Sequence, residues 1–509
     1  VTWWDEGKPW IDYITHCEFL LQQGYPIADV AYYTGESVPV ETRIGEPTTP
    51  FGYDYDAINA DVLLHRIVVK NGRLTLPNGI SYSALVLPAE DPNMTPQMLE
   101  RIAQLVREGA TVIGQPPKNT PSLTDFPKSD KQVKKLAAEL WGKCDGSNIT
   151  ENAVGKGHMV WGQSLSNVFA AQKLLPDFEF AKNSPDAKLA YVHRVAGDAD
   201  IYFVSNQRTQ DVSAECTFRV SGKTPELWHA DTGVIERAPV WHEQDGRTVV
   251  SLTFDPAGSV FVIFREPISG DHVVSAKADA DWQTVLAGDG NLLVKATSDG
   301  TAEFHTASGK TMHAIAANVP APLTVSDGWS LSFPPNWGAP ASVQLDKLIS
   351  WTDHTNDGVR YFSGTATYEK DLEIPAERLA ANSELWLDLG DVKNFAEVSL
   401  NGHDLGVLWK PPFRVNITSV AKPGTNKLVV KVTNLWPNRL IGDEQLPDDR
   451  EWNGKQLAAW PDWLLEGKPS PTGRFTFTTW HHWYKDDALL ESGLLGPVTL
   501  RTVEIVPVN

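Results

Sequence analysis

Apolar and polar residues alternate with a period of two in three short runs between Glu384 and Pro437. The apolar positions are Leu385, Leu387 and Leu389, then Val398 and Leu400, then Leu428, Val430 and Val432. This period is typical of β-strands that bury one face. Asn401-Gly402 follows the second run and suits a tight hairpin turn, and Pro423-Gly424 precedes the third. The region is therefore predicted to form an antiparallel sandwich.

A helical period appears near the start of the chain. Residues 11–24 predict an amphipathic helix with Ile14, Cys17 and Leu21 on one stripe, and Thr95-Pro96 predicts the start of a helix that ends at Gly109. A further helix is predicted at 57–66 with Asp56 as its cap, and strands are predicted at 27–32, 84–87 and 111–113. Alternating strands and helices with short connections predict a doubly wound parallel sheet.

From Lys188 onward the pattern changes to short alternating runs such as LAYVHRV and DIYFVSN. We expect an all-β region there, in two or three sandwiches. The predicted division of the chain is 1–25, 26–186 (α/β parallel sheet, glutamine amidotransferase-like), 187–268 (small β-sandwich), 269–335 (β-rich connecting segment) and 336–509 (jelly roll). A chain of 509 residues is long enough for several such domains.

Composition narrows the class of function. The net charge is −20, from 64 acidic and 44 basic residues, and this argues against binding to nucleic acid or anionic membranes. No apolar run reaches the roughly 18 residues of a membrane span, and the first residues lack the pattern of a signal peptide. The three cysteines, Cys17, Cys144 and Cys216, are too few and too dispersed for a disulfide framework or a zinc site.

The sandwich region resembles a known sugar-binding domain. Its runs VSLNG (398–402), LGVLWKPPF (405–413) and NKLVVKVTN (426–434) are similar to the jelly-roll domain of the family 2 type found in carbohydrate-active enzymes. The resemblance implies an accessory role in carbohydrate binding. It marks Trp409, Asn434 and Trp436 as sugar-site candidates, with core or turn positions as the alternative.

The first 59 residues resemble glycoside hydrolase family 106, the α-L-rhamnosidases. The resemblance is carried by TWWDEGKPW (2–10), CEFLLQQG (17–24), ADVAYYTGE (28–36) and GYDYDAIN (52–59), and the runs at 361–370 and 474–498 fit the same family. It covers the C-terminal half of a typical member. Residues 1–25 would then be the last loop and helix of a catalytic (β/α)8 barrel.

The family resemblance also implies a mechanism. Its members are understood to be inverting, calcium-dependent enzymes with two catalytic glutamates. No position of this sequence matches those glutamates, so we expect them upstream of Val1. The implied substrate is a rhamnose-containing glycan or glycoside, and a periplasmic or extracellular location is expected because polysaccharides do not cross membranes unaided.

Three groups of residues are candidates for the rim of a pocket. Trp3, Trp4 and Glu6 would lie at the mouth of the barrel, and Tyr33 and Glu36 follow a predicted parallel strand. Tyr53, Asp54 and Asp56 combine aromatic faces with carboxylates that suit sugar hydroxyls or calcium. The alternatives are packing for the tryptophans and helix capping for Asp56.

Two classes of function therefore remain open. The first is a rhamnosidase whose catalytic barrel lies on an upstream segment. The second is a non-catalytic carbohydrate-binding or assembly module, in which the α/β domain resembles the trimerisation domain of family 42 β-galactosidases and mediates homo-oligomer formation. A chelator-sensitive activity would favour the first class.

Overall fold

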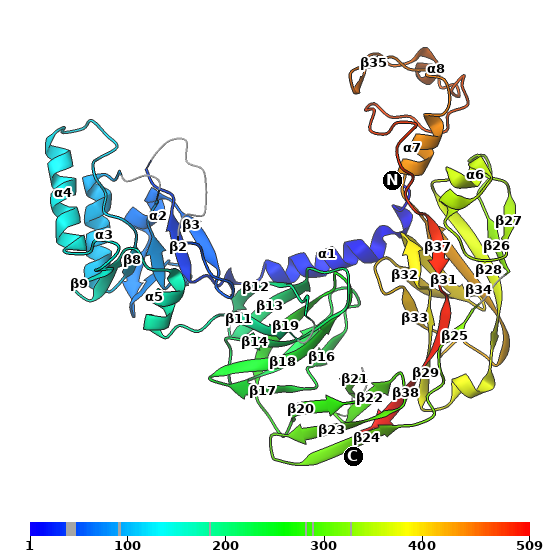
Figure 1. Ribbon diagram of the computed structural model, residues 1–509, viewed down its shortest axis with the longest axis horizontal. Helices are drawn as coiled ribbons and strands as arrows, with labels where there is room; N and C mark the ends of the chain where they lie inside the picture. Colours follow the sequence, from blue (N-terminus) through cyan, green and yellow to red (C-terminus); the bar gives the residue numbers. More distant parts are fainter. Residues whose placement is uncertain (37–46, 90–92, 183–184, 280–281, 288–289, 326–327) are drawn as a thin grey trace. The chain divides into compact units, whose positions relative to one another are not determined.

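The structure is a computed structural model that describes residues 1–36, 47–89, 93–182, 185–279, 282–287, 290–325 and 328–509 (Figure 1). The described chain forms two compact units. The first consists of Val1–Cys17, His229–Val240 and Asp271–Asn509, and the second of Glu18–Trp228 and Trp241–Gly270. None of the described helices is long and apolar enough to cross a membrane.

The second unit contains a six-stranded α/β sheet. Its order is β3 (Tyr55–Ile58), β2 (Val30–Tyr33), β7 (Ala84–Val86), β8 (Thr111–Ile113), β10 (Gly157–Val160) and β9 (Glu151–Val154). The first five strands are parallel, and β9 is antiparallel to β10. The parallel sheet that the sequence predicts is present, whereas the likeness to glutamine amidotransferases stays a prediction.

Helices cover both faces of this sheet (Figure 1). The helices are α2 (Ala60–His65), α3 (Pro96–Glu108), α4 (Lys128–Trp141) and α5 (Leu165–Gln172). The apolar faces of α3 and α4 pack with Leu85 and Val112 in one core, and α5 packs with Val86 and Ile113 in the other. Neighbouring residues of one strand point to opposite faces, so two cores form.

The ends of α3 agree with the prediction. The Thr95 side chain accepts a hydrogen bond from the Met98 N–H, and Gly109 ends the helix at a φ of 128°, which favours glycine. For the helix predicted at 57–66, the predicted start is wrong. Asp56 lies in β3, and Asn59 is the N-cap of α2, because the carboxamide oxygen of Asn59 accepts from Val62 N–H at 3.1 Å.

A β-sandwich completes the second unit. One sheet contains β1 (Tyr25–Pro26), β12 (Leu189–Ala196), β13 (Ala199–Asn206), β19 (Ser259–Pro267) and β15 (Lys223–Trp228); the other contains β11 (Phe178–Lys182), β14 (Val212–Phe218), β18 (Arg247–Phe254) and β17 (Trp241–Gln244). Buried aromatic rings of Tyr202, Phe218 and Phe264 fill the space between them. A small sheet of β4 (Val68–Lys70), β5 (Arg73–Thr75) and β6 (Ser81–Tyr82) turns at Asn71-Gly72.

The first unit is built on two antiparallel sheets, in agreement with the predicted sandwich. One has the order β27 (Ser342–Leu345), β26 (Trp329–Ser332), β28 (Thr365–Ile374), β34 (Gly424–Thr433), β31 (Phe395–Leu400) and β32 (His403–Leu408). The other has the order β21 (Gln283–Leu286), β22 (Leu292–Ala296), β38 (Thr499–Pro507), β29 (Ser383–Asp388) and β33 (Arg414–Asn416), and β25 (Leu323–Thr324) pairs with β38. The predicted connecting segment 269–335 thus supplies β22, β25 and β26 to these sheets.

The period-two pattern identifies the buried face of this sandwich. Leu385, Leu387, Leu389, Val398, Leu400, Leu428, Val430 and Val432 are all fully buried in one core. Asn401 and Gly402 have φ values of 53° and 82° and join β31 to β32. Those values match the tight hairpin that the Asn-Gly pair predicts.

The remaining elements are short. The strands are β16 (Ile235–Arg237), β20 (Val273–Ala278), β23 (Gly300–Thr306), β24 (Thr311–Ala316), β30 (Asp391–Lys393), β35 (Trp452–Asn453), β36 (Gln456–Leu457) and β37 (Gly493–Gly496), and the helices are α1 (Lys8–Leu21), α6 (Asp357–Arg360), α7 (Pro437–Asp443) and α8 (Asp462–Leu465). Helix α1 begins before the predicted residue 11. Leu20 is its one buried residue, and Cys17 is only half-buried. The membership of α1 in a barrel stays a prediction.

Candidate functional site

The first predicted group of residues contacts the jelly-roll sheet. The Trp3 ring stacks on Phe395 with ring centroids 5.6 Å apart and an interplanar angle of 12°. Glu6 Oε1 accepts hydrogen bonds from the hydroxyls of Thr365 at 3.2 Å and Thr433 at 3.1 Å. Trp4 is 69% exposed. The structure therefore gives Trp3 and Glu6 packing contacts and leaves Trp4 on the surface.

The second group lies where β2 ends. Tyr33 is buried in the core below α3 and α4. The Glu36 carboxylate accepts hydrogen bonds from both the backbone N–H and the hydroxyl of Thr95, each at 2.7 Å. Thr95 is the N-cap of α3, so Glu36 holds the start of that helix.

The third group also makes contacts with other residues of the protein. The Tyr53 ring packs on Phe169 at 4.4 Å, and its hydroxyl donates to the Leu174 carbonyl at 2.8 Å. Asp56 accepts from the Tyr82 hydroxyl at 2.8 Å. Burial raises the pKa of Asp54 above its ordinary value, although the hydrogen bond from the Tyr55 N–H acts in the opposite direction.

These carboxylates do not gather as a metal site requires. Among the residues that the structure describes, no three His, Cys, Asp or Glu side chains group so that they could hold an ion. A calcium ion takes six to eight oxygen ligands. Calcium therefore stays a prediction that rests on the family resemblance.

In the jelly roll, Asn434 is buried and its amide has partners on both sides. Its Nδ2 donates to the Phe362 carbonyl at 2.8 Å and to Ser492 Oγ at 3.0 Å, and its Oδ1 accepts from Gly364 N–H at 2.9 Å. Trp409 packs against Tyr13. Trp436 lies near Trp337, with ring centroids 6.1 Å apart. A sugar-binding role for these three candidates stays a prediction.

A different part of the first unit gathers more side chains of the kinds that bind ligands. We call residues 444–484 the Trp-rich loop, because they contain five of the chain's 19 tryptophans: Trp452, Trp460, Trp463, Trp480 and Trp483. The loop follows α7 and has little regular structure beyond β35, β36 and α8. Its density of tryptophan is the sequence signal that could have identified this loop as a candidate site.

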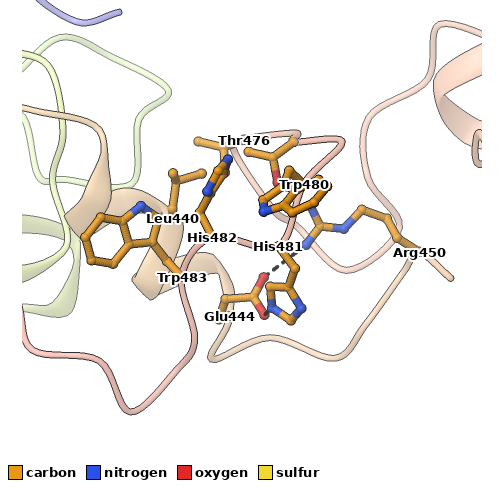
Figure 2. Close-up of a pocket in the computed structure, with 9 residues that line it drawn as sticks. Leu440, Glu444, Arg450, Thr476, Trp480, His481, His482 and Trp483 are labelled. Atoms are coloured by element: carbon orange, nitrogen blue, oxygen red, sulfur yellow. Dashed lines mark hydrogen bonds and ion pairs between the residues drawn. The ribbon is translucent and has the colours of Figure 1, made fainter. Parts of the chain in front are cut away.

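A cluster of charges holds the loop together. Glu444 pairs with Arg450 at 3.0 Å, Arg474 at 2.8 Å and His481 at 2.8 Å, and Figure 2 shows its carboxylate beside Arg450 and His481. The side chains of Arg450 and Arg474 are only 3% and 2% exposed, and both also face Asp449 at 3.5 and 3.3 Å. We call these five residues the Glu444 cluster.

The surroundings of Glu444 keep its carboxylate ionised. Burial by itself would raise the pKa of Glu444, but the hydrogen bonds and charges of Arg474 and His481 outweigh that effect. The pKa of Glu444 is consequently lowered. A carboxylate held in this way is a poor proton donor near neutral pH. Its observed geometry suits an anchor better than a general acid.

Aromatic rings extend the cluster. The Arg450 guanidinium lies 4.9 Å from the centroid of the Trp452 ring, Trp452 stacks on His481 at 4.7 Å and 13°, and His481 contacts Tyr484 at 4.3 Å. The pocket in Figure 2 opens beside these groups, and its lining includes Thr476, Trp480, His482 and Trp483. The Glu444 cluster thus fixes one wall of a pocket whose other walls are aromatic and polar.

Comparison with known proteins identifies related families. Residues 1–242 match the family model Glyco_hydro_106, described as alpha-L-rhamnosidase. Residues 350–467 match the model described as glycosyl hydrolase 2 galactose-binding domain-like. Both resemblances predicted from the sequence are confirmed. The second match ends within the Trp-rich loop.

Two relatives extend along nearly the whole chain. The structure of a rhamnosidase from Novosphingobium sp. PP1Y has a TM-score of 0.74 and 32% sequence identity, covering 98% of this chain and 41% of that one. A protein of Formosa agariphila with the name "Putative beta-glucuronidase" is 30% identical over 684 aligned positions, covering 99% of this chain and 57% of its own length. This chain therefore spans about half the length of the relatives that it matches.

Proposed function

We propose that this chain, whose first 242 residues match the alpha-L-rhamnosidase family, is part of a glycoside hydrolase that releases terminal α-L-rhamnose from glycans or glycosides. One observation carries the proposal. The likeness to the Novosphingobium rhamnosidase joins 32% identity to a TM-score of 0.74 across 98% of the chain. The galactose-binding-like match at 350–467 supports a carbohydrate substrate.

The proposed reaction inverts the anomeric carbon with two carboxyl groups. One protonates the leaving oxygen and the other activates water, which requires the two groups to stand roughly 6.5 to 9.5 Å apart. In this chain Glu6, Glu36 and Glu444 each accept hydrogen bonds from protein groups that hold other elements in place. We therefore propose that the catalytic pair lies on a preceding barrel segment and that the enzyme acts in the periplasm or outside the cell.

Within that enzyme, we propose that this chain supplies scaffold and substrate-contacting surface. The Glu444 cluster positions the aromatic wall formed by Trp480 and Trp483. Nearly buried ion pairs hold their partners in place, because leaving either partner unpaired is costly. Such a wall can orient a sugar without taking part in proton transfer.

The test compares the 509-residue chain alone with the same chain joined to its preceding segment, using an aryl α-L-rhamnoside as substrate. We expect no turnover by the chain alone and clear turnover by the joined protein. Adding a chelator tests the predicted calcium requirement in the same assay. Turnover by the chain alone would refute the proposed location of the catalytic pair, and no turnover by a folded joined protein would refute the rhamnosidase proposal.

An aryl β-D-glucuronide belongs in the assay as a second substrate. The name of the Formosa agariphila relative refers to that activity. A rhamnosidase site and a glucuronidase site differ in the charge of the sugar that they accept. We expect hydrolysis of the rhamnoside and little of the glucuronide.

A further inference from the structure

A second pocket lies in the Trp-rich loop, next to the one in Figure 2. It has a volume of about 360 Å³ and is lined by Gln456, Leu457, Ala458, Ala459, Trp460, Thr479 and Trp480. This volume falls within the range of small-molecule sites, about 300 to 1,000 Å³. Trp480 lines both pockets. We call the second one the Trp460–Trp480 pocket.

The backbone holds its two sides together. Gln456 and Trp480 form an antiparallel bridge, Leu457 N–H donates to the Thr479 carbonyl at 3.0 Å, and His481 N–H donates to the Lys455 carbonyl at 2.8 Å. The second bond connects this pocket to the Glu444 cluster, because the side chain of His481 pairs with Glu444. Backbone contacts within the chain thus hold the two sides of the pocket together.

Trp460 has one covered face and one available face. Its ring stacks on Phe477 with centroids 5.7 Å apart and an interplanar angle of 25°, yet the residue is 56% exposed. Near-parallel stacking covers one side of an indole, so most of the exposure belongs to the other side. Trp463 packs against this pair, because its ring contacts Phe477 edge-on with ring centroids 5.9 Å apart.

Hydrogen-bonding groups accompany the aromatic surface. Trp480 is 39% exposed, and the indoles of Trp460 and Trp480 each carry one N–H donor. The Gln456 amide and the Thr479 hydroxyl lie in the same lining, which contains no charged side chain. A flat apolar face with neutral donors and acceptors at its edge complements a pyranose ring, whose C–H face is apolar and whose hydroxyls are polar.

We propose that the Trp460–Trp480 pocket binds one neutral sugar residue of a glycan, by stacking on the two indoles and hydrogen bonding to Gln456 and Thr479. The choice of a sugar rests on the proposed function, and the choice of a neutral one rests on the uncharged lining. A uronic acid would bring a carboxylate to a wall with no cation to receive it. The pocket therefore selects against charged sugars.

The experiment measures sugar binding to the 509-residue chain by calorimetry and by saturation-transfer NMR. The probes are methyl α-L-rhamnoside, D-galactose and D-glucuronate. We expect the neutral sugars to bind and Trp480→Ala or Trp460→Ala to weaken binding about tenfold or more, as for a central aromatic contact. Trp460→Phe, which keeps a stacking face and loses the indole N–H, should weaken binding by only about threefold.

The control is Leu465→Ala, which removes a 69% exposed apolar side chain of α8 outside the lining. It should leave binding unchanged, and near-UV circular dichroism should show all variants folded alike. Binding that ignores both tryptophan substitutions, binding of glucuronate alone, or no binding at millimolar sugar would overturn the proposal even if rhamnoside hydrolysis succeeds. Tryptophan-dependent binding of a neutral sugar would support it even if hydrolysis fails.

Discussion

The jelly-roll sheets and the Trp-rich loop belong to one compact unit, but different forces hold them. In the sheets, regular backbone ladders surround a core that includes fully buried Leu387, Leu400 and Val430. In the loop, the paired strands β35 and β36 have only two residues each, and a buried cluster of opposite charges takes the place of an apolar core. The free energy lost from an apolar core grows with the apolar area that is removed. A buried charge that loses its partner instead costs its full desolvation penalty in one step. The loop should therefore respond to single changes locally and abruptly.

Neutralising Glu444 should have the largest effect. Glu444→Gln leaves Arg450 and Arg474 buried with less compensating charge, and breaking a buried pair costs about 3–5 kcal/mol. Hydrogen exchange should show residues 444–484 opening while the amides of β28 and β34 remain protected. Glu466→Gln is the matched control, because Glu466 pairs with Lys468 on the surface, where both side chains are more than half exposed. Equal protection of the loop in both variants would refute the anchoring role of the cluster.

A core truncation should act on the whole sandwich. Leu387→Ala removes a fully buried side chain of β29, and such changes lower the free energy of unfolding by about 2–5 kcal/mol. Urea unfolding followed by far-UV circular dichroism measures the loss. Leu465→Ala should change stability by less than about 0.5 kcal/mol. If Leu387→Ala opened the Trp-rich loop alone, the contrast between the two regions would be wrong.

As the pH falls, the Trp-rich loop should open at a higher pH than the jelly-roll sheets. The pKa of Glu444 is lower in the folded protein than in the unfolded chain, since the effects of Arg474 and His481 exceed the cost of burial. Its contribution to stability is complete above the unfolded pKa of about 4.3, and it is lost as the pH falls through the lower folded value. Hydrogen exchange of residues 444–484 between pH 7 and pH 3 should show this loss in the wild type and a weaker pH dependence in Glu444→Gln. Identical acid responses would argue against Glu444 as the titrating group.

The smallest effect is expected at Glu36. Glu36→Gln weakens the two hydrogen bonds from Thr95 at the start of α3, and a lost cap costs about 1 kcal/mol. A thermal melt should show a small decrease relative to Glu139→Gln, whose side chain is half-exposed and lies 4.0 Å from Lys135. A decrease as large as that of Leu387→Ala would mean that Glu36 does more than cap α3.

The same contrast explains what the sequence could predict. The period-two runs, the Asn401-Gly402 hairpin and the α3 helix follow from neighbouring residues, and the structure has each of them. The sequence predicts Asp56 as the cap of α2 because aspartate is a good capping residue. The pairing of β3 with β2 places Asp56 in a strand instead, and Asn59 caps the helix.

The Glu444 cluster could not be found by such local patterns. Its members Glu444, Arg474 and His481 are separated by up to 37 residues, and no period connects them. The predicted pocket residues Trp3, Glu36 and Tyr53 were recognised by type and position, and the structure places them in packing or capping contacts. Residue type predicts chemistry, but only the fold determines which groups already have partners.

The most direct test of the proposed function is the ratio of kcat/KM for an aryl α-L-rhamnoside to that for an aryl β-D-glucuronide, measured with this chain joined to the proposed preceding segment. We expect a ratio well above one, and a lower kcat/KM for the rhamnoside when Glu444→Gln loosens the Trp-rich loop. A ratio below one, or a folded protein that hydrolyses neither substrate, would contradict the proposed rhamnosidase function.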